Sequence, residues 1–323
     1  MKQLLALTTL AVVLQAQGPG PRAQAQTSAP ARTPAPKAAP APAAAFDSSR
    51  AWEHLRQMVA IGPRPSGSAA IRQTRAYITR QLSSLGLTVQ EQPFTAVTPL
   101  GNVEMANLIA RLPGRRADRV LLTGHYDTKL YRDKVFVGAS DGASSAAILI
   151  ELARVLKTRP HEFAYELVWF DGEEAVCDLW DQCSKPGAPD NTYGSRYYVE
   201  AAKKANALAS IKTMILFDMI GAKNLRLQRD GSSTPWLTDL IWAAARRLGQ
   251  SATFVDQKTD IGGDDHMPFI QAGVPAVDII DLMDYPQWHT KDDDLAHVAA
   301  GSLQIVGDVI LAALPDIERR LMR

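Results

Sequence analysis

The stretch YELVWFDGEEAVCDLWDQC, from Tyr165 to Cys183, begins as an apolar strand pattern and continues into a segment rich in acidic residues. Its first six residues, Tyr165 to Phe170, are mostly apolar and aromatic over the length of one strand, and the Asp-Gly pair that follows ends the run. Three carboxylates, Asp171, Glu173 and Glu174, stand at this strand end. Ligands bind at the carboxyl ends of strands in open α/β sheets, so the two neighbouring glutamates are candidates for a functional site. Solvated turn residues would give the same local pattern.

Strand and helix patterns alternate along the rest of the chain. Further strands are predicted at 86–94, 103–112, 119–127, 211–222 and 274–280. Helical spacing is found at 48–61, 69–85, 142–156, 195–205, 234–249 and 302–321, with Thr234 as an N-cap and a bend or interruption at Pro315. This alternation predicts an α/β fold, a three-layer sandwich with a central mixed, largely parallel sheet flanked by helices.

The N-terminal region has the pattern of an exported protein. Lys2 precedes an apolar segment too short to span a bilayer, and the small-residue run AQAQ follows it. We expect residues 1–25 to be a signal peptide, 26–45 an Ala/Pro-rich disordered linker, and 46–323 a single catalytic domain. A short membrane anchor is the alternative. The prediction is therefore a periplasmic or secreted protein without stable membrane association once the signal is cleaved.

Charge and cysteine content restrict the partners. The formal net charge is +1, and no basic run is interleaved with aromatic residues, so no nucleic-acid partner is expected. The two cysteines, Cys177 and Cys183, are spaced unlike any familiar zinc finger or ribbon. A disulfide between them is favoured in an exported protein.

Ionisable side chains recur where predicted strands end or a helix begins. These are His125, Asp127, Asp141, Glu173, Glu174, Asp218 and His289. Singly, each has an ordinary explanation, such as a helix N-cap or a surface histidine. Together they offer imidazole and carboxylate ligands from several loops, which is what a catalytic zinc with one open position requires. One glutamate of the pair would then bind the metal while the other faces the substrate as a proton shuttle.

A serine hydrolase is the rival hypothesis from the residues alone. GASDG, from Gly138 to Gly142, fits the G-x-S-x-G nucleophile motif between an apolar segment and a helix. Ser140 would be the nucleophile, with Asp218 and His289 as its partners. This hypothesis explains neither the HYD segment nor the two glutamates, and no Gly-rich oxyanion motif precedes it.

The chain resembles the zinc exopeptidase superfamily, which holds two-zinc aminopeptidases and single-zinc, animal-type glutaminyl cyclases. The resemblance rests on GHYDTK, GASDGASSAAILIELAR, FDGEEA, YGSR, FDMIGA, DDHMPFIQAGVP and WHTKDD. It implies a zinc held by Asp141, Glu174 and His289, with Glu173 as general acid/base. Asp218 matches a second-zinc ligand of the peptidases and a catalytic acid of the cyclases.

Three details are similar to the cyclase branch: Lys129 in HYDTK, the acid pair Asp264–Asp265 before His266, and Trp288 before His289. By this likeness Asp264 and His266 line the pocket, and Trp288 walls the cavity for the substrate side chain. Trp180 corresponds to a second pocket tryptophan, although it is followed by an apparent insertion, DQCSKPGAPDN.

The resemblance implies a glutaminyl-peptide cyclotransferase that uses one zinc ion per chain and acts on peptides or proteins with N-terminal glutamine. The alternative is a zinc aminopeptidase, in which His125 and Asp218 hold a second ion, Asp141 bridges the two, and Asp127 orients His125. A binding module that had lost catalysis would be expected to lack Glu173 or a ligand, and none is lacking.

Overall fold

The computed structural model describes residues 11–18, 20 and 44–323. The chain divides into Met1–Ala41 and a folded unit, Pro42–Arg323. The predicted signal peptide and linker lie for the most part outside the described residues. Residues 11–18 and 20 are exposed and have no regular secondary structure.

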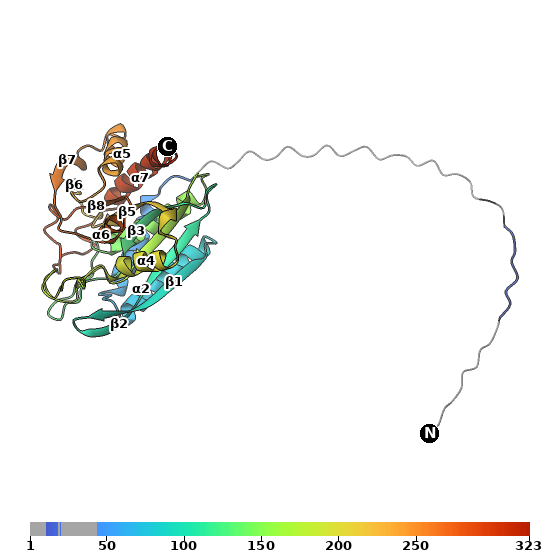
Figure 1. The fold of residues 1–323 in the computed structure, drawn as a ribbon, viewed down its shortest axis with the longest axis horizontal. Helices are drawn as coiled ribbons and strands as arrows, with labels where there is room; N and C mark the ends of the chain where they lie inside the picture. The colour runs from blue at the N-terminus through green and yellow to red at the C-terminus, as the bar shows by residue number, and fades with distance from the viewer. Residues whose placement is uncertain (1–10, 19, 21–43) are drawn as a thin grey trace, which may run out of the picture. The chain divides into compact units, whose positions relative to one another are not determined.

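The folded unit is built on a six-stranded mixed sheet with the order β1-β2-β4-β3-β5-β8 (Figure 1). Pairs β1/β2 and β2/β4 are antiparallel, whereas β3/β4, β3/β5 and β5/β8 are parallel. The strands are β1 (Val89–Thr98), β2 (Gly101–Leu112), β3 (Arg119–His125), β4 (Ala164–Phe170), β5 (Ile211–Asp218) and β8 (Ala276–Ile280). The mixed, largely parallel sheet predicted from the sequence is confirmed.

Helices cover both faces of this sheet, as a three-layer sandwich requires. One face packs against α1 (Ser48–Ile61), α2 (Ala69–Ser84), α3 (Ala143–Leu156), α5 (Pro235–Arg247) and α7 (Ala300–Leu321). The other face packs against α4 (Tyr193–Lys204) and α6 (Met267–Gln271). Alternate residues of each strand enter the two cores: Leu122 faces the larger core and Leu121 the smaller one.

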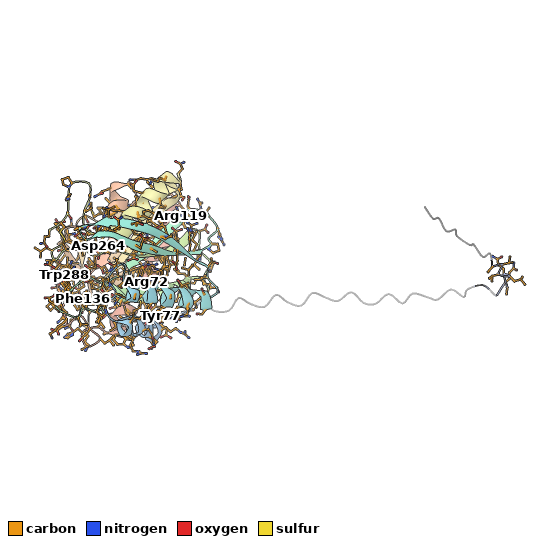
Figure 2. The ribbon with its side chains drawn as sticks, turned by 90° about the horizontal axis from the view of Figure 1, so that it is seen from below. Arg72, Tyr77, Arg119, Phe136, Asp264 and Trp288 are labelled. Atoms are coloured by element: carbon orange, nitrogen blue, oxygen red, sulfur yellow. A yellow bond between two sulfur atoms is a disulfide. The ribbon has the colours of Figure 1, made fainter. Side chains whose placement is uncertain are left out.

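Four parallel strands, β3, β4, β5 and β8, end at the same edge of the sheet. His125 and Asp218 are the last residues of β3 and β5, and Glu173 follows β4 by three positions. Figure 2 shows Asp264 and Trp288 at one side of the domain and Arg119, the first residue of β3, toward the other. The sheet therefore brings the predicted site residues to one edge.

Several local predictions are corrected. The segment directly before Ser140 is a loop, so α3 does not follow a strand-to-helix turn. A second, two-stranded sheet of β6 (Leu227–Asp230) and β7 (Phe254–Thr259) had no sequence signal. Thr234 precedes α5, but its hydroxyl accepts a hydrogen bond from Ala276 N instead of capping the helix.

Helix α7 continues through Pro315 without interruption. Pro315 itself is exposed, so its ring does not disturb the packing of the buried face of the helix. Of the described helices, α7 is also long and apolar enough by composition to cross a membrane. More than half of it is buried against the core, as in the central helix of a globular domain.

Candidate active site

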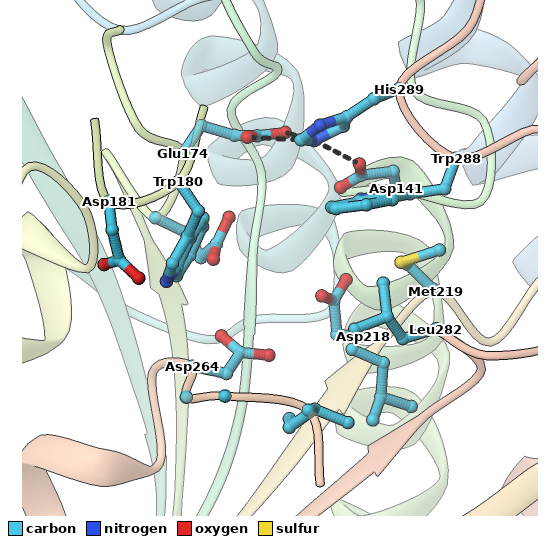
Figure 3. A pocket seen from close by; sticks show the side chains of 15 residues that line it. Asp141, Glu174, Trp180, Asp181, Asp218, Met219, Asp264, Leu282, Trp288 and His289 are labelled. Atoms are coloured by element: carbon cyan, nitrogen blue, oxygen red, sulfur yellow. Dashed lines mark hydrogen bonds and ion pairs between the residues drawn. The ribbon is translucent and has the colours of Figure 1, made fainter. Parts of the chain in front are cut away.

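A pocket of about 220 Å³ opens at the carboxyl edge of the sheet (Figure 3). It brings together most of the predicted site residues, which arrive from different loops. Its lining consists of Asp141, Glu173, Glu174, Trp180, Asp181, Asp218, Met219, Ile261, Gly262, Gly263, Asp264, Ile280, Leu282, Trp288 and His289.

Asp141, Glu174 and His289 form a group of candidate metal ligands in this pocket. His289 Nε2 lies 3.4 Å from Asp141 Oδ2 and 3.2 Å from Glu174 Oε2. Both oxygens are buried and have no hydrogen-bond partner in the part of the chain that the structure describes. Donor atoms roughly 3.3 Å apart suit a tetrahedral zinc ion with bonds of about 2.0 Å. The donor set therefore fits the metal that the sequence predicts.

A tight turn before α3 presents Asp141. Gly142 has a φ of +86°, and a Cβ at this position would lie 2.5 Å from the carbonyl oxygen of Asp127. Only glycine fits this backbone. Asp293 holds the turn from the other side, since its carboxylate accepts hydrogen bonds from Ser140 N at 2.8 Å and Asp141 N at 3.0 Å.

Arg64 supports the same turn, although no sequence pattern pointed to it. Its guanidinium is fully buried and donates to the carbonyls of Tyr126 at 2.9 Å, Gly138 at 3.0 Å and Val137. Burial lowers the pKa of Arg64 to about 10, so it stays charged at neutral pH. A buried cation thus lies under the turn that carries Asp141, in the field of several carboxylates.

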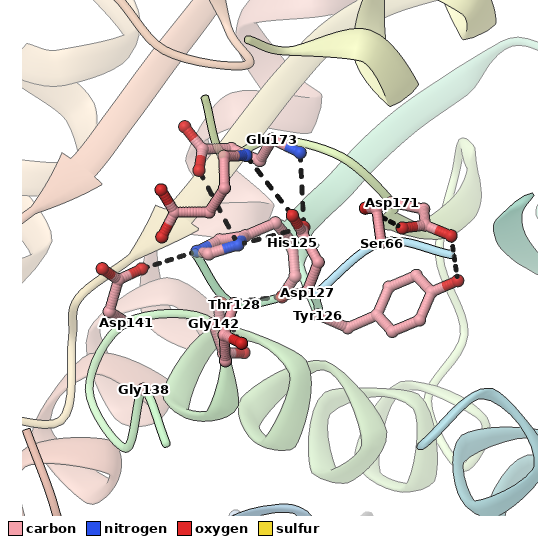
Figure 4. Close-up of polar contacts among 12 residues, drawn as sticks. Ser66, His125, Tyr126, Asp127, Thr128, Gly138, Asp141, Gly142, Asp171 and Glu173 are labelled. Carbon is pink, nitrogen blue, oxygen red and sulfur yellow. Dashed lines mark hydrogen bonds and ion pairs between the residues drawn. The ribbon is translucent and has the colours of Figure 1, made fainter. Parts of the chain in front are cut away.

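The Asp127 carboxylate binds the backbone of both neighbouring glutamates. Its Oδ1 accepts a hydrogen bond from Glu173 N at 3.3 Å, and its Oδ2 accepts one from Glu174 N at 3.4 Å (Figure 4). Asp127 Oδ1 also lies 3.5 Å from His125 Nδ1. The Asp127 carboxylate therefore fixes the backbone of the glutamate pair. It also lies beside His125, the residue that Asp127 orients according to the family resemblance.

The environments of the two glutamates move their pKa values in opposite directions. Burial raises the pKa of Glu173 well above its ordinary value; His125 opposes this rise, and Asp264 adds to it. Burial also acts on Glu174, but the His289 ring and its hydrogen bond outweigh burial and lower the pKa of Glu174. A pair of carboxyl groups with divergent pKa values can supply an ionised ligand and a proton-transfer group.

Asp171, the third carboxylate of the opening stretch, does not line the pocket. It is fully buried, and burial raises its pKa to about 6. Its carboxylate accepts hydrogen bonds from Ser66 Oγ, Ala106 N, Arg75 Nη2 and Tyr126 OH, at 2.6, 2.9, 3.1 and 3.2 Å. These contacts connect the loop before α2 to strands β2 and β4, so Asp171 stabilises the fold instead of lining the pocket.

His125 lies between two carboxylates beneath the ligand group. Its Nε2 is 3.0 Å from Asp218 Oδ1 and 3.2 Å from Asp141 Oδ1, and the side chain is buried. Although burial favours the neutral ring, the Asp218 charge and these contacts raise the pKa of His125 well above its ordinary value. His125, Asp141 and Asp218 form a second group that is close enough to hold an ion.

The acid pair before α6 divides between two environments. Asp264 lines the pocket, and burial together with the Asp218 charge raises its pKa to about 7. Asp265 does not line the pocket, and its carboxylate accepts a hydrogen bond from Ser195 on α4. His266 is not in the lining either: it is fully buried, with Nε2 2.7 Å from Ser232 Oγ. The expected pocket role of His266 is corrected accordingly.

The serine-hydrolase hypothesis is contradicted by the position of Ser140. Its side chain is fully buried, and its hydroxyl accepts a hydrogen bond from Gly221 N at 3.2 Å. His289 Nε2 faces Asp141 and Glu174 instead of Ser140. No strand-to-helix elbow exposes the serine, because the segment before it is a loop.

The loop that carries Trp180 is closed by the predicted disulfide, Cys177–Cys183, which the structure confirms. Trp180 lines the pocket despite the insertion that follows it. Lys129 is buried below this loop and donates hydrogen bonds of 2.8 Å to the carbonyls of Ala175 and Cys177. The lysine thus anchors the base of the loop.

Aromatic side chains surround His289. Trp288 stacks on its ring at 4.3 Å, and Tyr131 and Phe136 approach it edge-on at 6.0 and 5.7 Å. His289 has a φ of +55°, and Met219, which also lines the pocket, has a φ of +49°. Left-handed backbone at residues other than glycine is strained and concentrates at functional sites.

The chain is similar to known proteins over most of its length. The model of Peptidase family M28 matches residues 107–314. A glutaminyl-peptide cyclotransferase from Bos taurus is 31% identical over 268 residues, which cover 72% of this chain and 71% of the relative. A solved glutaminyl cyclase from an Acidobacteriales bacterium has a TM-score of 0.79 and 36% identity, covering 90% of this chain and 99% of its own. A leucine aminopeptidase precursor from Bacteroides thetaiotaomicron has a TM-score of 0.78 and 25% identity, with coverages of 84% and 98%.

These matches confirm the resemblance on which the sequence analysis relied. The family match includes all three candidate ligands and both pocket tryptophans. The chain belongs to peptidase family M28 and, within it, to the glutaminyl-peptide cyclotransferases.

Proposed function

We propose that the protein is a glutaminyl-peptide cyclotransferase, which converts the N-terminal glutamine of peptides to pyroglutamate and releases ammonia. The observation that carries this proposal is a single pocket lined by the ligand group Asp141, Glu174 and His289, by Glu173 with its raised pKa, and by two tryptophans. The identity with named cyclotransferases over most of the chain supports it.

Asp141, Glu174 and His289 are proposed to hold one zinc ion. When bound, zinc supplies Lewis acidity that polarises a carbonyl oxygen and stabilises negative charge on it. The resemblance to single-zinc cyclases supports one ion per chain.

The chain's own residues are proposed to position the substrate and move its proton. Trp288 and Trp180 flank the pocket and hold the glutamine side chain folded back toward its own α-amine. The amine nitrogen attacks the γ-carbonyl carbon, and the bond from that carbon to the amide nitrogen breaks. Glu173 accepts the amine proton and returns it to the departing nitrogen, which leaves as ammonia. Its raised pKa suits a group that both takes and gives a proton.

Asp218 and Asp264 are proposed to support Glu173. Both are buried, both have raised pKa values, and both line the same pocket. A proton held between such carboxyl groups keeps their combined charge low. Asp127 would then position Glu173 through the hydrogen bond that it accepts from the Glu173 backbone N–H. His125 would position Asp218 through its contact with the Asp218 carboxylate.

An aminopeptidase is the second candidate, because His125, Asp141 and Asp218 are grouped as a second ion would require. Likeness to a leucine aminopeptidase precursor also favours it. Such an enzyme would activate water and release the first residue of a peptide.

One experiment distinguishes the two. The purified protein is assayed for ammonia release from a peptide that begins with glutamine and for release of leucine from a leucine amide, and its zinc content is measured. We expect ammonia release, little leucine release and one zinc per chain. Two zinc ions per active chain, with cleavage of the amide and no change in the glutamine peptide, would establish the aminopeptidase instead.

We further propose that the protein is exported to the periplasm or secreted. The disulfide supports this location, since such bonds persist in oxidising compartments.

A further inference from the structure

Asp181 differs from every other carboxylate in the pocket lining. The lining carboxylates Asp141, Glu173, Glu174, Asp218 and Asp264 are each at most 5% exposed. Asp181 is exposed, and within residues 44–323 its side chain forms no hydrogen bond or ion pair. No lysine or arginine lines the pocket. The mouth of the site therefore carries one negative charge that no neighbouring cation neutralises.

The neighbour of Asp181 is an aromatic ring that lines the same pocket. Figure 3 shows the Asp181 carboxylate beside the Trp180 indole, with Trp288 and the ligand group across the pocket. A carboxylate next to a tryptophan face suits an arginine side chain. Its planar guanidinium can stack on the indole while its N–H groups bond the carboxylate.

The loop that carries these two residues is fixed at its base. The Cys177–Cys183 disulfide closes it, and Asp190 accepts hydrogen bonds from Val176 N at 3.3 Å and Cys177 N at 2.9 Å. Lys129 donates to two carbonyls of the same segment. A group held on a closed, anchored loop loses little conformational entropy when it binds a ligand.

We infer that Asp181, with Trp180, selects peptides in which arginine follows the N-terminal glutamine. This inference rests on the proposed function, because it concerns the rest of the same substrate. The proposed reaction places the glutamine at the group formed by Asp141, Glu174 and His289, so the next residue lies against the rest of the lining, to which Trp180 and Asp181 belong. An exposed ion pair changes affinity by roughly two- to fivefold, and we expect a preference of this size.

The test compares matched peptides that differ only at the second residue: Gln-Arg and Gln-citrulline, which has nearly the same shape without the charge. We expect kcat/KM to be about two- to fivefold higher for Gln-Arg, mainly through a lower KM, and the preference to fall as salt is added. Asp181→Asn should bring the ratio of the two kcat/KM values close to one.

Asp178→Asn is the matched control. Asp178 is exposed on the same loop and loses the same charge, but it does not line this pocket. The ratio should survive in Asp178→Asn. Equal rates for the two peptides in the wild type, or equal loss of preference in both variants, would overturn the inference while leaving cyclisation established. Failure to cyclise any glutamine peptide would contradict the proposed function and this inference with it.

Discussion

Arg64 and Gly138 are joined by a hydrogen bond of 3.0 Å, from the guanidinium Nη2 to the carbonyl oxygen three residues before Asp141. Arg64 is fully buried and forms no ion pair within the described residues; among these residues, only carbonyl groups accept hydrogen bonds from its guanidinium. A buried cation held in this way offsets the charge of nearby carboxylates, while its donors fix the turn that presents one of them.

Replacing Arg64 should therefore weaken the metal site without touching a ligand. Arg64→Met removes the three guanidinium hydrogen bonds that hold the turn before Asp141, so we expect zinc affinity to fall by about 10- to 100-fold, as for other residues that orient ligands. Competition with a chelator measures this directly. Arg72→Met is the control, since Arg72 is exposed and donates to Gly67 O on the surface. Unchanged zinc affinity in Arg64→Met would refute the role.

The paired glutamates should separate by mutation. Glu173→Gln removes a proton acceptor but no ligand, so turnover should fall by about 10² or more with zinc retained. Glu174→Gln should lose zinc, because an amide is a poorer ligand than an ionised carboxylate. Zinc content and single-turnover rate are measured on both variants. If Glu173→Gln loses the metal and Glu174→Gln keeps it, the assignment of the pair is reversed.

Removing the disulfide should affect the pocket more than the fold. The loop between Cys177 and Cys183 is short, so its closure contributes at most about 3 kcal/mol in the chain-entropy model. We expect the double Cys→Ser variant to show a modestly lower Tm and a raised KM for glutamine peptides, because Trp180 and Asp181 lose their fixed positions. A KM equal to that of the wild type would show that the loop holds its shape without the bond.

Asp281 should make stability depend on pH. It is buried, and burial raises its pKa from 3.8 to about 7. Between these values the folded state binds the proton more often than the unfolded chain does. The free energy of unfolding therefore decreases as the pH rises from about 4 to about 7, and the contribution of Asp281 is absent above pH 7.

Asp281→Asn removes this titration and keeps an acceptor for Arg226 N. Relative to the wild type, its Tm should rise more at about pH 8 than at about pH 5. Asp178→Asn, at an exposed position, serves as the control. An equal change in Tm at both pH values for Asp281→Asn would contradict the prediction.

Local sequence patterns predicted much of the architecture. Apolar runs of strand length alternate with segments in which apolar residues recur at helical spacing. Both patterns arise because part of each strand or helix is buried in the core. Parallel strands end at a common edge, so the sequence predicts that His125, Asp218 and the glutamates after Phe170 meet there. The motif residues Asp141, Glu174 and His289 also meet in one pocket.

Other features depended on how distant segments pack. Arg64 bonds backbone carbonyls at Tyr126, Val137 and Gly138, and any residue type supplies a carbonyl, so no sequence pattern marks such a partner. Asp264 and Asp265 are neighbours in the chain, yet only Asp264 reaches the pocket, because the turn before α6 points their side chains to opposite sides.

From the sequence alone followed the alternation of the main strands and helices and the chemical types of the site residues, because both depend on periodicity and side-chain chemistry along a short segment. Only the tertiary structure decided which of those residues face the pocket. It buried His266 against Ser232 and left Asp181 exposed at the mouth. Burial and hydrogen-bond partners are properties of packed, distant segments, and they set the charge state and access on which function depends.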